Sequence, residues 1–288
     1  MKLARTLPLM ILLGAMACEN GADPTANSAV PQFSDSHLPP GAIAVNTCGA
    51  VLSTPGDYWV TKDLTCGGTH TLLPVIQVGG TNVTLHLNNH TLRSGRNPIP
   101  ETSACLTVGG TGNTVVGPGQ VGGFCDRGIS LSGSHNTLHG LRIFGWDLAL
   151  ELNPGFANTV EDVTFIGAGY AAVYGAATID SLVLRRNTVN GNYENGFKNM
   201  AGTNQVIEYN TLFNVGFAMT IGGTGSTIRG NKVLNAGDAL IVTGTGLTII
   251  DNIFRHNSWD ITDKNANPCV VNHYANNIFA RASDSCIQ

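Results

Sequence analysis

Residues 184–189 read LRRNTV, and this phrase returns as residues 207–212 (IEYNTL), 228–233 (IRGNKV) and 249–254 (IIDNIF). The asparagines shared by the four copies are 23, 21 and 21 residues apart and are Asn187, Asn210, Asn231 and Asn252. A fixed period in the twenties, built from short apolar phrases and turn residues, is typical of a solenoid. The sequence therefore predicts a repetitive β-structure.

The apolar residue three places before each asparagine, the asparagine itself and the apolar residue two places after it are predicted to face inward. Side chains alternate between the two faces of a strand, and a turn residue before the asparagine changes the phase. A buried amide is costly unless it is hydrogen-bonded, but stacked asparagines can bond one another and the turn backbone. We predict an Asn ladder that could end at Asn277 and that consists of Asn187, Asn210, Asn231 and Asn252.

A second apolar phrase follows in each repeat, as in residues 128–131 (GISL), 216–221 (GFAMTI) and 237–242 (GDALIV). No ten-residue helical periodicity separates the phrases, which argues against helix-containing repeats. From residue 75 to 278 the chain resembles the right-handed parallel β-helix of the pectate-lyase-like superfamily, a scaffold that carries many unrelated activities. The predicted fold class is all-β, a single-stranded right-handed parallel β-helix with a period of about 21–24 residues and disulfide-stapled caps at both ends.

The nearest alternative solenoid is the Ca²⁺-binding β-roll, which requires Asp in a Gly-Gly-x-Gly-x-Asp pattern. Residues 109–113 (GGTGN) and 222–226 (GGTGS) lack that Asp, so we reject this alternative. The chain has 36 glycines and only 12% charged residues, in keeping with strands and turns. Its net charge of −4 gives no basic field for nucleic acid, and we expect a monomer without a nucleic-acid partner.

Residues 1–17 have the pattern of a signal peptide, with Lys2 and Arg5 before an apolar run and small residues after it. Residues 15–18 (AMAC) are similar to the cleavage site of bacterial lipoproteins, which implies a lipid on Cys18; plain secretion is the alternative. Residues 18–40 are rich in Ala, Ser, Asn and Pro and are predicted to be a flexible tether. We expect an extracytoplasmic protein, either anchored to the outer membrane through Cys18 or secreted.

The chain has seven cysteines, and six remain if Cys18 is lipidated. Six cysteines allow 15 pairings. Their proximity in the sequence favours the disulfides Cys48–Cys66, Cys105–Cys125 and Cys269–Cys286. An oxidising compartment would permit these bonds.

Residues 41–74 are predicted to form an N-terminal cap hairpin. Residues 50–52 (AVL) and 58–60 (YWV) flank a Pro-Gly-Asp turn, which is a hairpin signal. A cap is expected because a bare coil end would expose strand edges and core. The β-helix with its C-terminal cap is predicted over residues 75–288.

Residues 192–198 (NYENGFK) are the strongest candidate for chemistry. Phe197 takes a core position in the pattern, so Lys198 should point outward. Small side chains on neighbouring coils should leave room for a sugar chain around it; these are Ala172, Ala218 and Ala239.

A β-elimination lyase needs a base for the proton α to a uronate carboxyl group, a cation for the developing charge and an acid for the leaving oxygen. We predict Lys198 as the base and Tyr193 or Tyr174 as the acid. The predicted catalytic set is Lys198, Tyr193, Glu194 and Tyr174. The predicted substrate-binding set is Asp147, Glu151, Tyr170, Arg185 and Arg229.

Residues 194–211 also resemble the catalytic coil of the chondroitinase-B and alginate-lyase family, through Glu194, Lys198, Asn204 and the pair Asn210-Thr211. In that family a Lys on one coil and an Arg on the next carry the elimination. In the next coil the corresponding stretch, residues 216–221 (GFAMTI), has no Arg. The paired Asp of polygalacturonases, the Trp-x-Asp-His and Arg-x-Pro-x-x-Arg motifs of pectate lyases and the Asp-Pro-His-Asp motif of mannuronan epimerases are absent.

Arg185, Glu208 and Arg229 hold the same outward position on successive repeats. They are predicted to form either a solvated charge ladder, worth little individually, or a strip that contacts carbohydrate. The sequence shows no acidic cluster for a metal, although residues from different coils could assemble a Ca²⁺ site.

Two functions follow. The first is a surface or secreted enzyme on polysaccharide, a lyase or a glycoside hydrolase, and the second is a non-catalytic carbohydrate-binding or structural β-helix.

Overall fold

The computed structural model describes residues 38–66, 74–95, 103–145, 147–167 and 169–287. The predicted signal peptide, Cys18 and nearly all of the tether lie outside the described residues. Within the described part, strands β1 to β31 form three parallel sheets, and the one α-helix is the short α1 (Pro268–Val271). No helix in this part of the chain is long and apolar enough to span a membrane.

Sheet A contains one strand from each coil, paired in this order: β1 (Ile43–Val45), β3 (Gly56–Val60), β6 (Val83–His86), β9 (Thr114–Val116), β12 (Thr137–His139), β15 (Thr159–Glu161), β19 (Val183–Arg185), β22 (Val206–Glu208), β25 (Thr227–Arg229), β28 (Thr248–Ile250) and β31 (His273–Ala275). Sheet C follows the next turn of each coil: β4 (Leu64–Cys66), β7 (Thr91–Ser94), β10 (Gln120–Gly123), β13 (Arg142–Ile143), β16 (Thr164–Gly167), β20 (Thr188–Gly191), β23 (Thr211–Phe213), β26 (Lys232–Leu234) and β29 (Ile253–Arg255).

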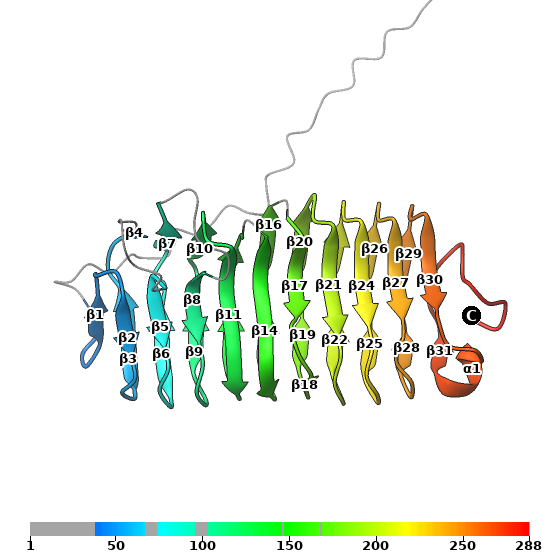
Figure 1. The fold of residues 1–288 in the computed structure, drawn as a ribbon, viewed down its shortest axis with the longest axis horizontal. Helices are drawn as coiled ribbons and strands as arrows, with labels where there is room; N and C mark the ends of the chain where they lie inside the picture. Colours follow the sequence, from blue (N-terminus) through cyan, green and yellow to red (C-terminus); the bar gives the residue numbers. More distant parts are fainter. Residues whose placement is uncertain (1–37, 67–73, 96–102, 146, 168, 288) are drawn as a thin grey trace, which may run out of the picture. The chain divides into compact units, whose positions relative to one another are not determined.

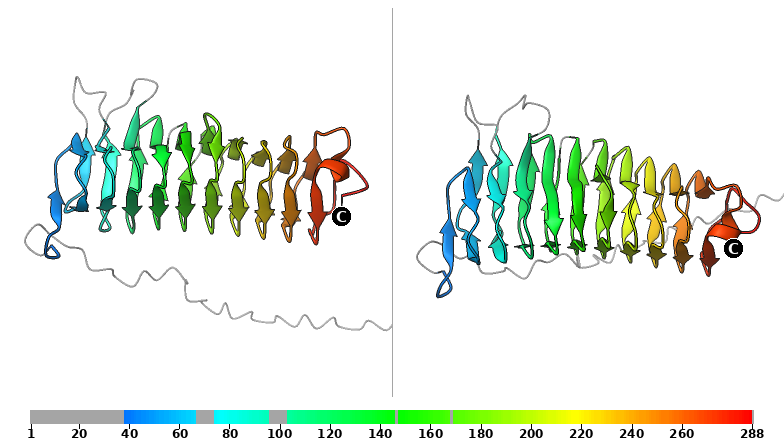
Figure 2. Two further views of the ribbon diagram at one scale, coloured as in Figure 1. Left: turned by 90° about the horizontal axis from the view of Figure 1, so that it is seen from below. Right: turned by 60° about the horizontal axis from the view of Figure 1, so that its bottom comes forward.

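Sheet B completes each coil: β2 (Ala50–Leu52), β5 (Ile76–Val78), β8 (Ala104–Val108), β11 (Arg127–Ser134), β14 (Leu148–Phe156), β17 (Ala171–Gly175), β21 (Asn195–Met200), β24 (Phe217–Ile221), β27 (Asp238–Val242) and β30 (Trp259–Asp263), with β18 (Ile179–Asp180) paired to the end of β14. The coils stack in chain order (Figure 1), and the same stacking is visible from two other directions (Figure 2). The predicted right-handed parallel β-helix is confirmed.

The repeated phrase turns a corner of the β-helix. Leu184 lies in sheet A and Val189 in sheet C, and both are fully buried. Between them Arg186 adopts a positive φ of 54°, and Tyr209, one coil later, has a φ of 56°. This left-handed residue changes the phase, so the phrase that reads as one unit in the sequence forms two strands.

The Asn ladder is present at this corner. The backbone N–H of Asn187 donates to Oδ1 of Asn210 at 2.9 Å, and that of Asn210 donates to Oδ1 of Asn231 at 3.0 Å. The pattern continues from Asn231 to Asn252 and from Asn252 to Asn277. Stacking therefore satisfies side chains that would be costly to bury alone.

A second ladder, which the sequence analysis missed, lies at the corner between sheets B and A. Asn113, Asn136 and Asn158 are buried, and each Oδ1 accepts from the backbone N–H of the preceding coil. Further along, Ser226 accepts from the N–H of Gln205 in the same way. Because the side-chain type changes from Asn to Gln and Ser along this ladder, no single letter marks it over all the coils.

The predicted N-terminal hairpin is wrong. β2 pairs in parallel with β5, and β3 pairs in parallel with β1 and β6. These segments alternate apolar and polar residues, as hairpin strands do. They are instead the first coils of the solenoid, because their apolar residues extend its core.

The three predicted disulfides are confirmed. Their Cα–Cα distances are 5.7 Å for Cys48–Cys66, 5.5 Å for Cys105–Cys125 and 6.2 Å for Cys269–Cys286. Cys105 and Cys125 are buried, so their bond lies inside the β-helix. Cys269 lies in α1, near the C-terminal end of the β-helix, where the cap was predicted.

Candidate functional site

Predicted site residues from three coils meet on the outer face of sheet B. Glu151 of β14 lies opposite Tyr174 of β17, and Tyr174 lies opposite Lys198 of β21. Ser130 of β11 precedes Glu151 in the same register. We call Ser130, Glu151, Tyr174 and Lys198 the Lys198 row; its four strands lie side by side (Figure 1).

Lys198 points outward as predicted, but its surroundings differ from the prediction. Its Nζ lies 5.9 Å from the ring centroid of Phe217 on β24. The small side chains that were expected around it, those of Ala172, Ala218 and Ala239, are instead fully buried in the core. Strict alternation fails here because these strands have two or three consecutive buried positions near their start.

Tyr193 is not an accessible catalytic acid, which corrects the prediction. Its side chain is only 1% exposed, and its hydroxyl has no hydrogen-bond partner among the described residues. Burial raises the pKa of the Tyr193 hydroxyl well above its ordinary value. The ring packs inward because Gly167 leaves space for it: a Cβ added there would lie 3.2 Å from the Tyr193 hydroxyl oxygen.

Tyr174, an interior member of the Lys198 row, forms an aromatic pair with Tyr170, which precedes β17. Their ring centroids are 5.9 Å apart, with 60° between the ring planes. Burial raises the pKa of Tyr170, and the nearby Tyr174, Glu194 and Asp147 raise it further. The predicted site residues Tyr170, Tyr174, Glu194 and Asp147 are therefore neighbours in the folded protein.

Acidic side chains lie near Tyr170. Burial raises the pKa of Asp147, the charge of Asp126 adds to that effect, and Arg127 opposes it. Glu194 is exposed on the turn before β21. The face therefore combines amine, phenol and carboxyl groups.

Glu151 is held in place by its neighbours. Its Oε1 lies 3.0 Å from Nε of Arg127, and its Oε2 accepts from the Ser130 hydroxyl at 3.3 Å and from Nδ2 of Asn153 at 3.2 Å. The residue is only 8% exposed. These contacts fix the Glu151 carboxylate on the outer face of sheet B and pair it with the guanidinium of Arg127.

A groove of about 370 Å³ adjoins Lys198, and sequence reasoning did not find it. It is lined by Gly175, Ala176, Ala177, Thr178, Asn199, Ala201, Thr220, Gly222 and Thr243. The pairing of β21 with β24 is irregular between Phe197 and Met200, next to this groove. The sequence signal for this groove was the run of small residues from 175 to 177 (GAA), whose short side chains leave the space open.

Arg185 and Arg229, predicted to bind substrate, lie on sheet A instead of sheet B. Nε of Arg185 is 2.5 Å from Oε2 of Glu161, and Arg229 pairs with Glu208. They form the charge ladder that the sequence analysis gave as one alternative. A single ligand site on sheet B therefore does not include Arg185 or Arg229.

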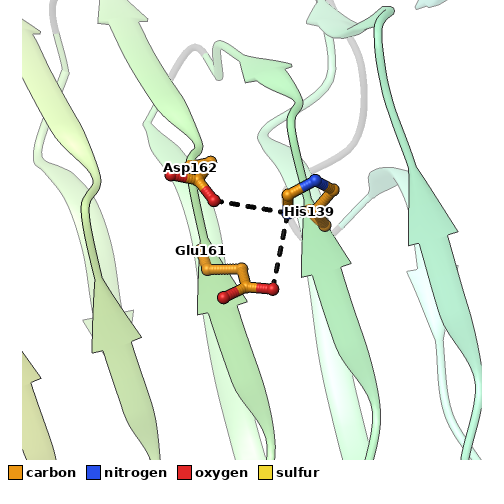
Figure 3. Close-up of side chains that lie close together, drawn as sticks. All are labelled: His139, Glu161 and Asp162. Carbon is orange, nitrogen blue, oxygen red and sulfur yellow. Dashed lines mark ion pairs between the residues drawn. The ribbon is translucent and has the colours of Figure 1, made fainter.

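One cluster of metal-ligand side chains occurs in the described residues, and it also lies on sheet A. Nδ1 of His139 is 3.4 Å from Oε1 of Glu161 and 3.5 Å from Oδ2 of Asp162 (Figure 3).

Arg185 and Arg186 already neutralise both carboxylates of this cluster. Nη2 of Arg186 lies 3.0 Å from Oε2 of Glu161 and 2.8 Å from Oδ2 of Asp162. The hydrogen bond from Arg186 is the main reason why the pKa of Asp162 is lowered. Ca²⁺ takes six to eight oxygen ligands and is not favoured beside two guanidinium groups, so this cluster does not fit the Ca²⁺ that the sequence left open.

Comparisons with known proteins agree with the fold. A family profile described as "Right handed beta helix region" matches residues 127–284, more than half of the chain. A comparison with curated proteins found no match.

Two solved structures share the architecture. The pectate lyase Pel9A is 15% identical, with a TM-score of 0.62, over 81% of this chain and 70% of that one. DFA-IIIase from Arthrobacter chlorophenolicus A6, without its lid, is 11% identical, with a TM-score of 0.55, over 83% of this chain and 72% of that one. At these identities the likeness concerns the fold alone.

Proposed function

Because this chain belongs to the right-handed β-helix family and buried side chains fill the inside of its coils, we propose that the outer face of sheet B binds a polysaccharide. The observation that carries this proposal is the groove beside Lys198. Hydroxyl and amide groups line it, from Thr178, Asn199, Thr220 and Thr243. The pectate lyase on the same scaffold supports this reading by analogy.

The chemistry of this face suits sugar hydroxyl groups. Threonine hydroxyls and the asparagine amide both donate and accept, and the Lys198 amine adds further donors. Neighbouring coils are about 4.8 Å apart, which is similar to the length of one sugar unit in an extended chain. A polymer lying across the strands would therefore meet a new set of side chains at nearly every unit.

The proposed location is outside the cytoplasm. The three disulfides fit an oxidising compartment. Residues 1–17 would direct secretion, and Cys18 would carry the lipid if the protein is anchored.

Binding is tested by substitution within the groove. Thr220→Trp fills the groove and is expected to weaken polysaccharide binding at least about tenfold, because a bulky ring displaces the sugar. Affinity electrophoresis and calorimetry on acidic and neutral polysaccharides measure the change. The matched control is Thr227→Trp, at a half-buried threonine on sheet A. Equal effects of the two substitutions would exclude the groove as the binding site.

A second candidate function is β-elimination at this site. Tyr174 and Lys198 lie directly opposite one another on neighbouring strands, which favours it. Lys198 would remove the proton α to the uronate carboxyl group, and Tyr174 would protonate the leaving oxygen as the C–O bond breaks and a C=C bond forms. Lys198 would start as a neutral amine and become an ammonium as it takes the proton, and in that form it would stabilise the enolate charge. Arg127 is paired with Glu151 and would not contribute.

If elimination occurs, Lys198→Ala is expected to slow it at least about 100-fold, because the base is lost. The ultraviolet absorbance of the unsaturated uronate is the readout, on alginate, pectate, chondroitin and ulvan. Lys232→Ala, at an exposed lysine of β26, serves as the control. Absence of product from every uronate polymer, with the fold intact by circular dichroism, would remove elimination and leave the binding proposal standing.

A further inference from the structure

Two exposed aromatic rings lie at the first positions of strands of sheet B, whereas the groove is lined by residues near the other end of these strands. Phe217 of β24 is 38% exposed and Trp259 of β30 is 48% exposed. Phe217 lies opposite Asp238 of β27, and Asp238 lies opposite Trp259. We call Phe217, Asp238 and Trp259 the aromatic row; β24, β27 and β30 lie next to one another in Figure 1.

The aromatic row is not a continuous apolar patch. Asp238 separates the two rings, and the neighbouring outward row of the same strands contains Thr220, Ile241 and Thr262. A protein partner would favour an apolar core depleted of charge. Rings set among hydroxyl and carboxylate groups instead match a sugar, which has apolar C–H faces and a polar rim.

The spacing of the rings also fits a polysaccharide. Phe217 and Trp259 are two coils apart, roughly 10 Å from the coil spacing of a parallel sheet. Rings at this spacing would contact alternate units of an extended chain. Asp238 would then lie between them, where it can accept hydrogen bonds from hydroxyl groups of the intervening sugar.

Charge decides which sugars fit. A uronate carboxylate beside Asp238 would be repelled, whereas an uncharged sugar would not. Nζ of Lys198 lies 5.9 Å from the Phe217 ring and can donate to hydroxyl groups of a sugar stacked there. Lys198 therefore lies beside the first ring of the aromatic row, although Phe217 itself lies opposite Asn195 in the strand register.

We propose that Phe217 and Trp259 are two stacking subsites for uncharged sugar rings, extending the polysaccharide site toward the C-terminal coils. This inference rests on the proposed function and specifies it further. It selects polymers that present neutral sugars at these subsites over polymers made of uronate alone.

The test uses the double variant Phe217→Ala/Trp259→Ala of the full chain. Affinity electrophoresis and calorimetry are run on neutral polymers (mixed-linkage glucan, galactomannan, xylan and fructan) and on alginate and pectate. The double variant is expected to bind the neutral polymer at least about tenfold more weakly. Trp259→Phe keeps a ring and is expected to retain most of the affinity. The control is Tyr209→Ala, which removes a 52% exposed ring outside sheet B.

The outcomes separate this inference from the function on which it rests. Loss of binding in Thr220→Trp with full binding in the double variant would overturn the stacking subsites and leave the binding face in place. Binding of uronate polymers only would also overturn them. Binding of no polymer by the wild type would overturn both proposals. A wild-type dimer that the double variant converts to a monomer, measured by light scattering, would instead assign the row to contact with a second copy.

Asp238→Asn gives an independent check. Removing the charge between the rings is expected to increase affinity for pectate several-fold while leaving neutral polymers unaffected. An unchanged preference in this variant would contradict the proposed selection by charge.

Discussion

Asn231→Ala is expected to lower the free energy of unfolding by about 3 kcal/mol, because it removes an interior member of the Asn ladder. Oδ1 of Asn231 accepts from the backbone N–H and from Nδ2 of Asn210, both at 3.0 Å. Its Nδ2 donates to the Ile207 carbonyl at 2.8 Å and to Oδ1 of Asn252 at 3.0 Å. The substitution leaves the Asn210 N–H and the Ile207 carbonyl buried without these partners.

Urea unfolding monitored by circular dichroism measures this loss, and two further variants identify its cause. Asn277→Ala removes the half-buried last member of the ladder and is expected to cost clearly less. Asn231→Leu fills the space, as Leu141 does in the equivalent place of an earlier coil, but makes no hydrogen bond. If Asn231→Leu were as stable as the wild type, cavity formation and not hydrogen bonding would explain the loss in Asn231→Ala.

Gly223→Ala is expected to destabilise the protein by about 3 kcal/mol or more, through strain and a steric clash. Gly223 has a φ of 76°, and an added Cβ would lie 1.8 Å from the carbonyl oxygen of Gly202 on the preceding coil. That same oxygen accepts a hydrogen bond from the N–H of Thr224 at 3.0 Å. Relieving the clash therefore requires separating two stacked coils.

The matched control for this substitution is Gly246→Ala. Gly246 has a similar φ of 67°, but the nearest atom to its added Cβ is 3.6 Å away. It is expected to show only the cost of the left-handed backbone, about 1 kcal/mol. Equal losses in thermal and urea unfolding would mean that the close approach to Gly202 does not matter.

The architecture could be predicted because each coil repeats the same pattern of apolar, asparagine and turn residues. Leu184 and its equivalents define the core face, and the 21–24-residue period allows only stacked coils of this size. Asn187 and its equivalents are visible because one letter recurs at the same place. The disulfides followed from proximity in a chain whose neighbouring coils are also neighbours in space.

The candidate site could be predicted only in part. Tyr174 and Lys198 were correctly expected on one outward face, since alternation carries them there. Tyr193 was misplaced because the turn before β21 folds it into the core, and a hydroxyl-bearing ring gives no sign of this in the sequence. Arg185 was assigned to the same site although it lies on another sheet, because the number of corners between two residues sets their faces.

The sequence by itself determined the coil size, the inward residues and the Asn ladder, since these depend on interactions that repeat at a constant separation along the chain. Only the tertiary structure decided the features that depart from simple alternation and regular pairing. These are the consecutive buried positions beside Ala172 and Ala218 and the irregular pairing of β21 that adjoins the groove. The physical reason is that a surface site arises from register between coils, and register is set by the summed packing of every corner.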